Sequence, residues 1–353
     1  MPAPETPPDP RLGGRDWRGV PTDHFDGDRF FNPGGDGPRG LRDLLRWRFR
    51  GKRQPWPPVV PSPFPSDAPP LLVDGGAVRI SFVGHATFLI QVAGLNMLTD
   101  PIWSDRASPF RLAGPRRYNP PGIAFADLPR IDVILLSHGH YDHLDRQTLS
   151  RLWDRDQPRV VTPLGNAAVA RADRPSMTVT EADWGDTVPL SAGARMTLVP
   201  AHHWSARWPW DRNRALWGGF VIAAPDRSIY YAGDTGFDGG RPFRYVRQHH
   251  GPPDLALLPI GAYEPRWFMG PQHMNPDDAV MALALLGARQ ALGYHWGTFR
   301  LTDEAAEQPA IDLAAARGTH GVPPDQFIAM RPGQVWSGWR AQDRADTARA
   351  LTG

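Results

Sequence analysis

His138-Gly139-His140-Tyr141-Asp142-His143 places four residues of metal-binding types within six consecutive positions. It follows Asp132-Val133-Ile134-Leu135-Leu136-Ser137, a largely apolar run typical of a strand buried on both faces. We therefore expect the ligands on a loop at the carboxyl end of a strand. Zinc is held by imidazoles and carboxylates at roughly 2.0–2.2 Å. Because two pairs of such groups suit two ions about 3.5–4 Å apart better than one ion, the stretch predicts a two-metal site.

Other strand ends have to supply the remaining ligands. The candidates each follow an apolar run: His202 or His203 after Val199-Pro200, Asp234 after Tyr231-Ala232-Gly233, and His295 after Gly293-Tyr294. A carboxylate has two oxygens and can bridge two cations, which makes Asp234 the natural shared ligand. A single histidine after a strand is usually capped or on the surface. Six or seven His and Asp residues at successive strand ends instead favour a metal centre, although the choice between His202 and His203 stays open.

Short apolar runs outside the motif define the fold class. Predicted strands cover residues 77–83, 87–92, 95–99, 159–162, 196–200, 216–224, 228–232, 254–259 and 290–294. Predicted helices follow the motif and also cover residues 166–172, 242–248, 276–286 and 303–316. Grouped strands with interspersed helices fit two sheets packed between helices. We therefore predict an α/β fold, a four-layer αββα sandwich with the site along one edge.

Composition excludes several classes of protein. The 353 residues are 41% hydrophobic and 22% charged, which is typical of a globular chain with one large domain or two modest ones. The formal net charge is only +2, so nothing in the overall charge predicts nucleic-acid binding. The absence of cysteine excludes disulfides, thiolate zinc sites and a cysteine nucleophile.

No stretch of 18 apolar residues occurs, and Met1 to Asp16 lacks the apolar core of a signal peptide. We expect a soluble, cytoplasmic protein, and the sequence does not indicate an oligomeric state. Forty prolines and 36 glycines concentrate near the N-terminus and in turns. They predict a Pro/Gly-rich N-terminal wrap over residues 1–70, a catalytic domain over 71–340 and a C-terminal tail over 341–353.

A basic amphipathic segment lies within this wrap. Leu41, Leu44, Leu45 and Phe49 share one helical face, and arginines occupy the others. Such a helix can lie on an anionic membrane, so residues 39–53 are a candidate for peripheral membrane contact and would make the protein membrane-associated. The commoner alternative is that the leucine face packs on the domain.

Together these motifs resemble the metallo-β-lactamase superfamily, from about Ala77 to the C-terminal third of the chain. A closer resemblance, over most of the chain beyond residue 29, is to its N-acylphosphatidylethanolamine-hydrolysing phospholipase D family. The stretches that carry it are Phe30-Phe31-Asn32-Pro33, Gly84-His85-Ala86-Thr87, Thr99-Asp100-Pro101, His203-Trp204, Leu216-Trp217-Gly218 and His295-Trp296-Gly297-Thr298-Phe299.

The resemblance implies a ligand set and a reaction. In that family the His before the aromatic residue is the ligand, which implies His203. The implied sharing has one zinc ion at His138, His140 and His203, the other at Asp142, His143 and His295, and Asp234 bridging them. The implied reaction is hydrolysis of N-acylphosphatidylethanolamine, a phospholipid, to N-acylethanolamine and phosphatidic acid. Iron or manganese in place of zinc is not excluded by the ligand types.

Other readings of the same residues stay open. Relatives with this ligand set also act on lactones, and a soluble phosphodiester is an alternative substrate. A non-catalytic membrane-binding or nucleic-acid-binding module would use the basic segment at 39–53 but leaves the metal ligands unexplained.

Two residues are predicted to be catalytic. Asp142 is expected to bind metal and to orient the attacking water. His273, before a predicted helix, either begins that helix or places an imidazole beside the phosphate or leaving group, and the resemblance favours the second role. His85, on a Gly-His turn, is expected to fix that turn rather than to contact phosphate. Four arginines are candidates to meet the phosphate: Arg207, Arg212, Arg214 and Arg266.

Overall fold

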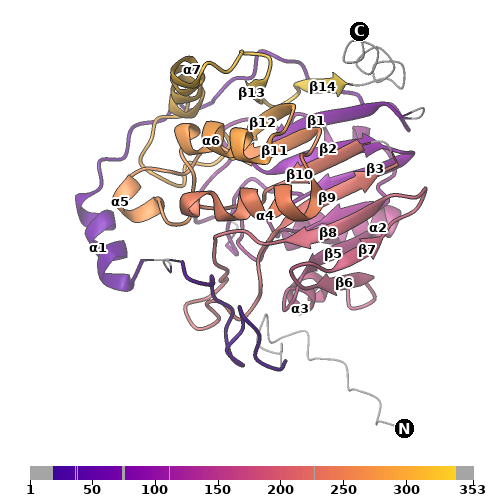
Figure 1. The fold of residues 1–353 in the computed structure, drawn as a ribbon, viewed down its shortest axis with the longest axis horizontal. Helices are drawn as coiled ribbons and strands as arrows, with labels where there is room; N and C mark the ends of the chain where they lie inside the picture. The colour runs from indigo at the N-terminus through magenta and orange to yellow at the C-terminus, as the bar shows by residue number, and fades with distance from the viewer. Residues whose placement is uncertain are drawn as a thin grey trace.

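The computed structural model describes residues 19–35, 37, 39–73, 76–110, 112–225 and 227–338. The predicted tail at 341–353 and the first 18 residues of the predicted wrap lie outside these ranges. Two seven-stranded sheets pack against each other, and helices lie on both sides of the pair (Figure 1). The predicted αββα sandwich is confirmed.

The first sheet has the strand order β14-β1-β2-β3-β4-β5-β6. Its strands are β1 (Val78–Gly84), β2 (Thr87–Val92), β3 (Leu95–Thr99), β4 (Val133–Leu135), β5 (Arg159–Pro163), β6 (Val179–Ala182) and β14 (Val335–Gly338). The strands from β14 to β3 pair antiparallel, and those from β3 to β6 pair parallel. The predicted meander at 77–99 is β1, β2 and β3.

The second sheet has the order β13-β12-β11-β10-β9-β8-β7. Its strands are β7 (Thr187–Pro189), β8 (Arg195–Val199), β9 (Gly219–Ala224), β10 (Arg227–Tyr231), β11 (Leu255–Pro259), β12 (Gln290–Tyr294) and β13 (Phe327–Ala329). The strands from β7 to β10 pair antiparallel and those from β10 to β13 parallel. Each sheet is therefore half antiparallel and half parallel.

The helices divide between the two outer faces. They are α1 (Leu41–Arg50), α2 (Arg146–Asp156), α3 (Ala167–Arg171), α4 (Arg241–His250), α5 (Arg266–Met269), α6 (Pro276–Leu286) and α7 (Gln308–His320), with short 3-10 turns at Phe125–Asp127 and Asp238–Gly240. One apolar cluster fills the space between the sheets. A second joins α4, α6 and α7 to the outer face of the second sheet, and a third joins α2 and α3 to the first. Burial of the apolar side chains in these three clusters is the main force that stabilises the sandwich.

Helix α1 does not pack as the commoner alternative predicted. Leu41 is 69% exposed, Phe49 is 81% exposed, and only Trp47 is buried. Trp47 stacks on Phe268 with ring centroids 5.0 Å apart and donates its indole N–H to Asp303 at 2.9 Å. In Figure 1, α1 lies at the side of the sandwich near α5. Arg46 also lies over the ring of Trp267, 4.8 Å from its centroid. The helix thus docks through Trp47 and Arg46 and leaves most of its apolar face open.

None of the helices in the described part of the chain combines the length and the apolar composition that a membrane span requires.

The strand directions bring the predicted site residues to one edge. Strands β1, β3 and β4 run the same way in the first sheet, as do β8, β10 and β12 in the second. The segments that follow their carboxyl ends therefore meet at the same edge of the sandwich. These segments carry His85, Asp100, the stretch from His138 to His143, His202 and His203, Asp234, and His295.

Candidate metal centre

Three imidazoles form the first group of candidate ligands. The Nε2 atom of His138 lies 2.8 Å from Nδ1 of His140, and Nε2 of His203 lies 3.3 Å from the same atom. His138 and His203 are buried, and burial, with neighbouring histidines, lowers the pKa of both well below the usual value. Neutral imidazoles whose ring nitrogens face one another are the arrangement that a metal ion requires.

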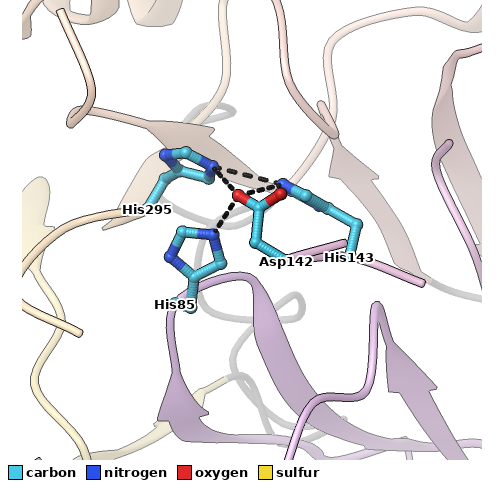
Figure 2. A group of neighbouring side chains, drawn as sticks. All are labelled: His85, Asp142, His143 and His295. Atoms are coloured by element: carbon cyan, nitrogen blue, oxygen red, sulfur yellow. Dashed lines mark hydrogen bonds and ion pairs between the residues drawn. The ribbon is translucent and has the colours of Figure 1, made fainter. Parts of the chain in front are cut away.

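A carboxylate and three imidazoles form the second group, which consists of Asp142, His143 and His295 from the predicted ligands together with His85 (Figure 2). The Nε2 atoms of His143 and His295 are 3.2 Å apart, and each lies 3.5 Å from Oδ2 of Asp142. Burial by itself would lower the pKa of both histidines, but Asp234 and Asp142 raise it, for His295 to about 9. The carboxylates thus attract positive charge to this part of the cluster, which a metal ion would supply in place of protons.

Asp234 joins the two groups. Its Oδ2 atom lies 3.2 Å from Nε2 of His143, 3.1 Å from Nε2 of His295 and 3.8 Å from Nε2 of His203. Its other carboxylate oxygen is buried and has no hydrogen-bond partner among the described residues. An unpartnered buried carboxylate oxygen is costly unless a cation lies beside it. This oxygen and the N/O donor set therefore fit a pair of zinc-type cations.

The structure separates the adjacent histidines His202 and His203. Nδ1 of His202 lies 2.9 Å from Oδ2 of Asp238, away from the cluster. His203 donates from Nδ1 to the carbonyl oxygen of Gln272 at 3.0 Å, which directs Nε2 towards His140. Of the two alternatives, only His203 is brought to the other candidates.

Asp100 supports the second group, although no role was predicted for it from its sequence position. It accepts hydrogen bonds from Nδ1 of His143 at 2.7 Å, from Ser137 N at 2.7 Å, and from the hydroxyls of Ser137 and Tyr231, both at 2.5 Å. Proton placement on Nδ1 leaves the Nε2 lone pair of His143 facing the site. The available signal was its position directly after β3, at the same edge as the motif.

We expect Asp100→Asn to lower metal affinity and metal-dependent turnover by roughly 10–100-fold, because a neutral amide with one acceptor oxygen replaces the carboxylate that holds the Nδ1 proton of His143. The measurement is metal retention during titration with a chelator, together with turnover at saturating metal. Asp105→Asn is the matched control, because Asp105 is exposed. Equal metal affinity in Asp100→Asn and the control would show that Asp100 does not position His143.

His85 contacts a candidate ligand rather than closing its turn. Its Nε2 atom lies 2.8 Å from Oδ2 of Asp142, and its backbone N–H is bound by Thr298 (Figure 2). Burial, together with the nearby His295, lowers the pKa of His85 to about 3, so its imidazole is neutral at physiological pH. It therefore donates an N–H to Asp142 and orients that carboxylate.

His273 lies at the margin of the cluster. Its Nδ1 atom is 4.0 Å from Oδ2 of Asp234, and its ring centroid is 5.1 Å from that of His203. Arg266 holds the backbone at this point, because it donates to the carbonyl oxygen of His273 at 2.9 Å and to Asp278 at 2.6 Å. His273 therefore faces the same space as the candidate ligands, from the loop between α5 and α6.

All four of the arginines considered for phosphate binding have other partners, and Arg212 donates to the carbonyl oxygen of Arg39 at 3.4 Å. Arg207 donates to the carbonyl oxygens of Gly139 and Leu144 at 2.9 Å each, which fixes the motif loop. Arg214 pairs with Asp28 at 2.8 Å, and Arg266 binds Asp278. Arg212 lies over the ring of Trp204, and that ring packs on His140 at 4.5 Å. Arg212 is therefore linked to the candidate ligands through the ring of Trp204.

Comparison with known proteins agrees with this geometry. A family model described as a beta-lactamase superfamily domain matches residues 95–296, which include every candidate ligand. The chain belongs to the metallo-β-lactamase superfamily. The resemblance seen in its motifs is confirmed.

Two relatives that match most of this chain are named as enzymes. An N-acyl-phosphatidylethanolamine-hydrolyzing phospholipase D of Caenorhabditis elegans is 39% identical over 276 residues, which cover 75% of this chain and 76% of the relative. A UPF0173 metal-dependent hydrolase of Pyrobaculum calidifontis is 30% identical over 258 residues, 73% of this chain and 99% of the relative. The prediction that this superfamily member is a metal-dependent hydrolase is confirmed.

A solved structure supports the fold alone. The isothiocyanate hydrolase from Delia radicum gut bacteria matches with a TM-score of 0.59 at 20% identity, covering 74% of this chain and 99% of that chain. The sandwich is thus shared with a hydrolase that is distant in sequence.

Proposed function

We propose that this protein is a di-zinc phosphodiesterase that hydrolyses N-acylphosphatidylethanolamine to N-acylethanolamine and phosphatidic acid. The observation that carries the proposal is the pair of facing ligand groups with Asp234 between them. Two adjacent cations suit the displacement of an oxygen at phosphorus. The substrate is supported by the 39% identity to a relative named for this phospholipid.

The proposed ligands are His138, His140 and His203 for one zinc ion, Asp142, His143 and His295 for the other, and Asp234 for both. When bound, the two ions supply positive charge at the phosphate and make water acidic enough to react near neutral pH. The site has only nitrogen and oxygen donors, which iron and manganese also accept. Metal analysis of protein purified without added zinc would identify the native ion.

Residues of the chain supply the remaining steps of the proposed reaction. Asp142, oriented by the N–H of His85, aligns the attacking water and accepts its proton. The water oxygen forms a bond to phosphorus, and the bond from phosphorus to the headgroup oxygen breaks. His273 donates an N–H to the phosphate or to the departing oxygen. The proton that Asp142 accepted from water passes to the departing oxygen, which leaves as N-acylethanolamine, while the phosphate stays on the diacylglycerol as phosphatidic acid.

Product analysis tests the proposed substrate. Zinc-loaded protein is incubated with N-acylphosphatidylethanolamine in detergent micelles and the products are identified by mass spectrometry. A chelated sample and Asp142→Asn serve as comparisons. Phosphatidic acid and N-acylethanolamine should form only with the intact, metal-loaded protein. Metal-loaded protein that forms neither product would exclude this substrate, and assays with lactones and soluble phosphodiesters would then separate the two alternatives.

We further propose that α1 brings the enzyme to its lipid substrate. Leu41, Leu44, Leu45 and Phe49 are all exposed, at 69%, 42%, 46% and 81%, and four of the other six positions of α1 are arginines. Exposed apolar side chains flanked by cations favour insertion at the surface of an anionic bilayer. This geometry supports the peripheral contact predicted for residues 39–53.

Vesicle flotation tests the role of α1. Leu45→Ser combined with Phe49→Ser should lower binding to anionic vesicles while turnover of a soluble, short-chain phosphodiester stays unchanged, because both side chains point away from the packed domain. Ile311→Ser is the matched control, because Ile311 is 59% exposed on α7. Equal flotation of the double variant and the control would place the lipid contact elsewhere.

A further inference from the structure

A cavity that is separate from the metal centre is lined mainly by arginine. Its volume is about 410 Å³, where roughly 10–15 Å³ is enough to hold one water molecule. Arg53, Arg106, Arg116 and Arg300 contribute to its wall, together with a glycine, a proline and a tyrosine, and none of the described residues that line it is acidic. We call these four residues and the space between them the arginine cavity.

Backbone pairing places three of these arginines side by side. Arg106 and Arg116 face each other across an antiparallel bridge, and Arg117 forms the next bridge with Phe299. Arg300 follows Phe299 directly, so three extended segments lie next to one another and carry one arginine each. Like charges opposite each other on paired segments destabilise the pairing. This arrangement therefore needs a compensating negative charge.

The described part of the chain supplies little of that charge. Arg53 lies 3.6 Å from Asp303, but Arg106, Arg116 and Arg300 form no ion pair with any carboxylate in the described ranges. Arg106 donates to the carbonyl oxygen of Gly114 at 2.7 Å and Arg116 to that of Pro58 at 3.0 Å, which fixes both guanidinium groups without neutralising them. Burial, together with the cations Arg48 and Arg300, lowers the pKa of Arg53. The cavity therefore concentrates positive charge.

We propose that the arginine cavity binds the phosphate of a phosphomonoester. Guanidinium groups bind phosphate oxygens through paired N–H donors, and a phosphomonoester carries about 1.5 to 2 negative charges at neutral pH, which suits a site of several arginines. The volume admits a phosphate with part of the group that it esterifies. This inference stands whether or not the enzyme cleaves N-acylphosphatidylethanolamine.

Two sources could supply this phosphate: the headgroup of phosphatidic acid in a bilayer, or a soluble phosphomonoester. Phe110 and Leu112, in the loop between Arg106 and Arg116, are 58% and 93% exposed. Exposed apolar side chains beside a cationic cavity are compatible with a lipid surface.

The chain neighbours of two lining arginines connect the cavity to the metal centre. Phe299, which precedes Arg300, contacts Arg117, which follows Arg116, and its ring centroid lies 5.1 Å from that of His85.

The lipid arm compares two sets of vesicles with matched surface charge, one containing phosphatidic acid and the other phosphatidylglycerol, in flotation with the metal-loaded full chain. The variant is Arg106→Gln combined with Arg300→Gln. The control is Arg130→Gln combined with Arg195→Gln, which removes the same charge from exposed positions outside the cavity. We expect a preference of the wild type for phosphatidic acid, and a loss of about tenfold or more in the variant only.

The soluble arm titrates glycerol 3-phosphate by calorimetry into wild type, variant and control. Binding that is lost in the variant, without a preference for phosphatidic acid vesicles, assigns the cavity to a soluble phosphomonoester. Glycerol 3-phosphate that binds at the metal centre would still bind to the variant, so the titration distinguishes the metal centre from the arginine cavity. If the Gln variant does not fold, Arg106→Lys combined with Arg300→Lys replaces it in the test. This variant retains the charge but removes the paired donors, so it should bind the phosphomonoester less tightly than the wild type. Variant and wild-type binding that are equal in both arms would overturn the proposal.

Discussion

Asp234→Asn is expected to lower metal-dependent turnover on the order of 10³-fold and to reduce the number of metal ions bound per chain, because it removes the carboxylate whose Oδ2 atom lies close to histidines of both ligand groups. The carboxylate oxygen that lies 3.1 Å from His295 and 3.8 Å from His203 carries the charge that would hold two cations together. Asparagine has nearly the same shape but no charge, so the loss should come from electrostatics rather than from packing. Metal content after dialysis and turnover at saturating zinc measure the two effects.

Asp238→Asn is the matched control for this change. Asp238 also follows β10 and contacts a histidine, but that histidine is His202, which points away from the cluster. The control should therefore retain its metal content and its turnover. If Asp234→Asn kept two metal ions and wild-type turnover, Asp234 would not be the bridging ligand.

His273→Ala is expected to lower turnover of N-acylphosphatidylethanolamine by about 10²–10³-fold while bound metal stays unchanged, because the leaving oxygen loses its donor. The imidazole lies beside the candidate ligands, 4.0 Å from Asp234, but outside the two groups that face each other. The loss should be much smaller for a phosphodiester with p-nitrophenol as leaving group, which departs without a proton. The comparison of turnover numbers for the two substrates measures the role directly.

His320→Ala provides the control, because His320 is a partly exposed histidine at the end of α7. An equal loss on both substrates would assign His273 to phosphate binding instead of to the leaving group. Loss of metal in His273→Ala would make it a ligand, and this outcome would contradict the proposed division of ligands.

Much of the architecture could be predicted because the strongest patterns are local. The alternating apolar runs at 77–99 form β1, β2 and β3, and the predicted helix at 276–286 is α6. β6, β7, β13 and β14, which have three or four residues each, escaped prediction. So few residues carry little periodicity, and pairing with neighbouring strands stabilises them instead.

The start of the last helix shows how tertiary contacts override a local pattern. A helix was predicted from Asp303, but α7 begins at Gln308. Asp303 accepts the indole N–H of Trp47, and Glu304 accepts the backbone N–H groups of Ala262 and Glu264. These residues are held by partners distant in the sequence, so the helix begins only after them.

The sequence by itself determined which chemistry this protein carries. Its His and Asp residues follow apolar runs whose strand character is local, and the strand directions then bring those residues to one edge. The tertiary structure alone decided which neighbours take part. His203 enters the cluster because Gln272 orients it, while Asp238 holds His202 outside. Likewise, α1 presents its leucines to the surroundings because Trp47, and not the leucine face, finds a partner on the domain. Such choices depend on contacts between residues far apart in the chain, which no local pattern encodes.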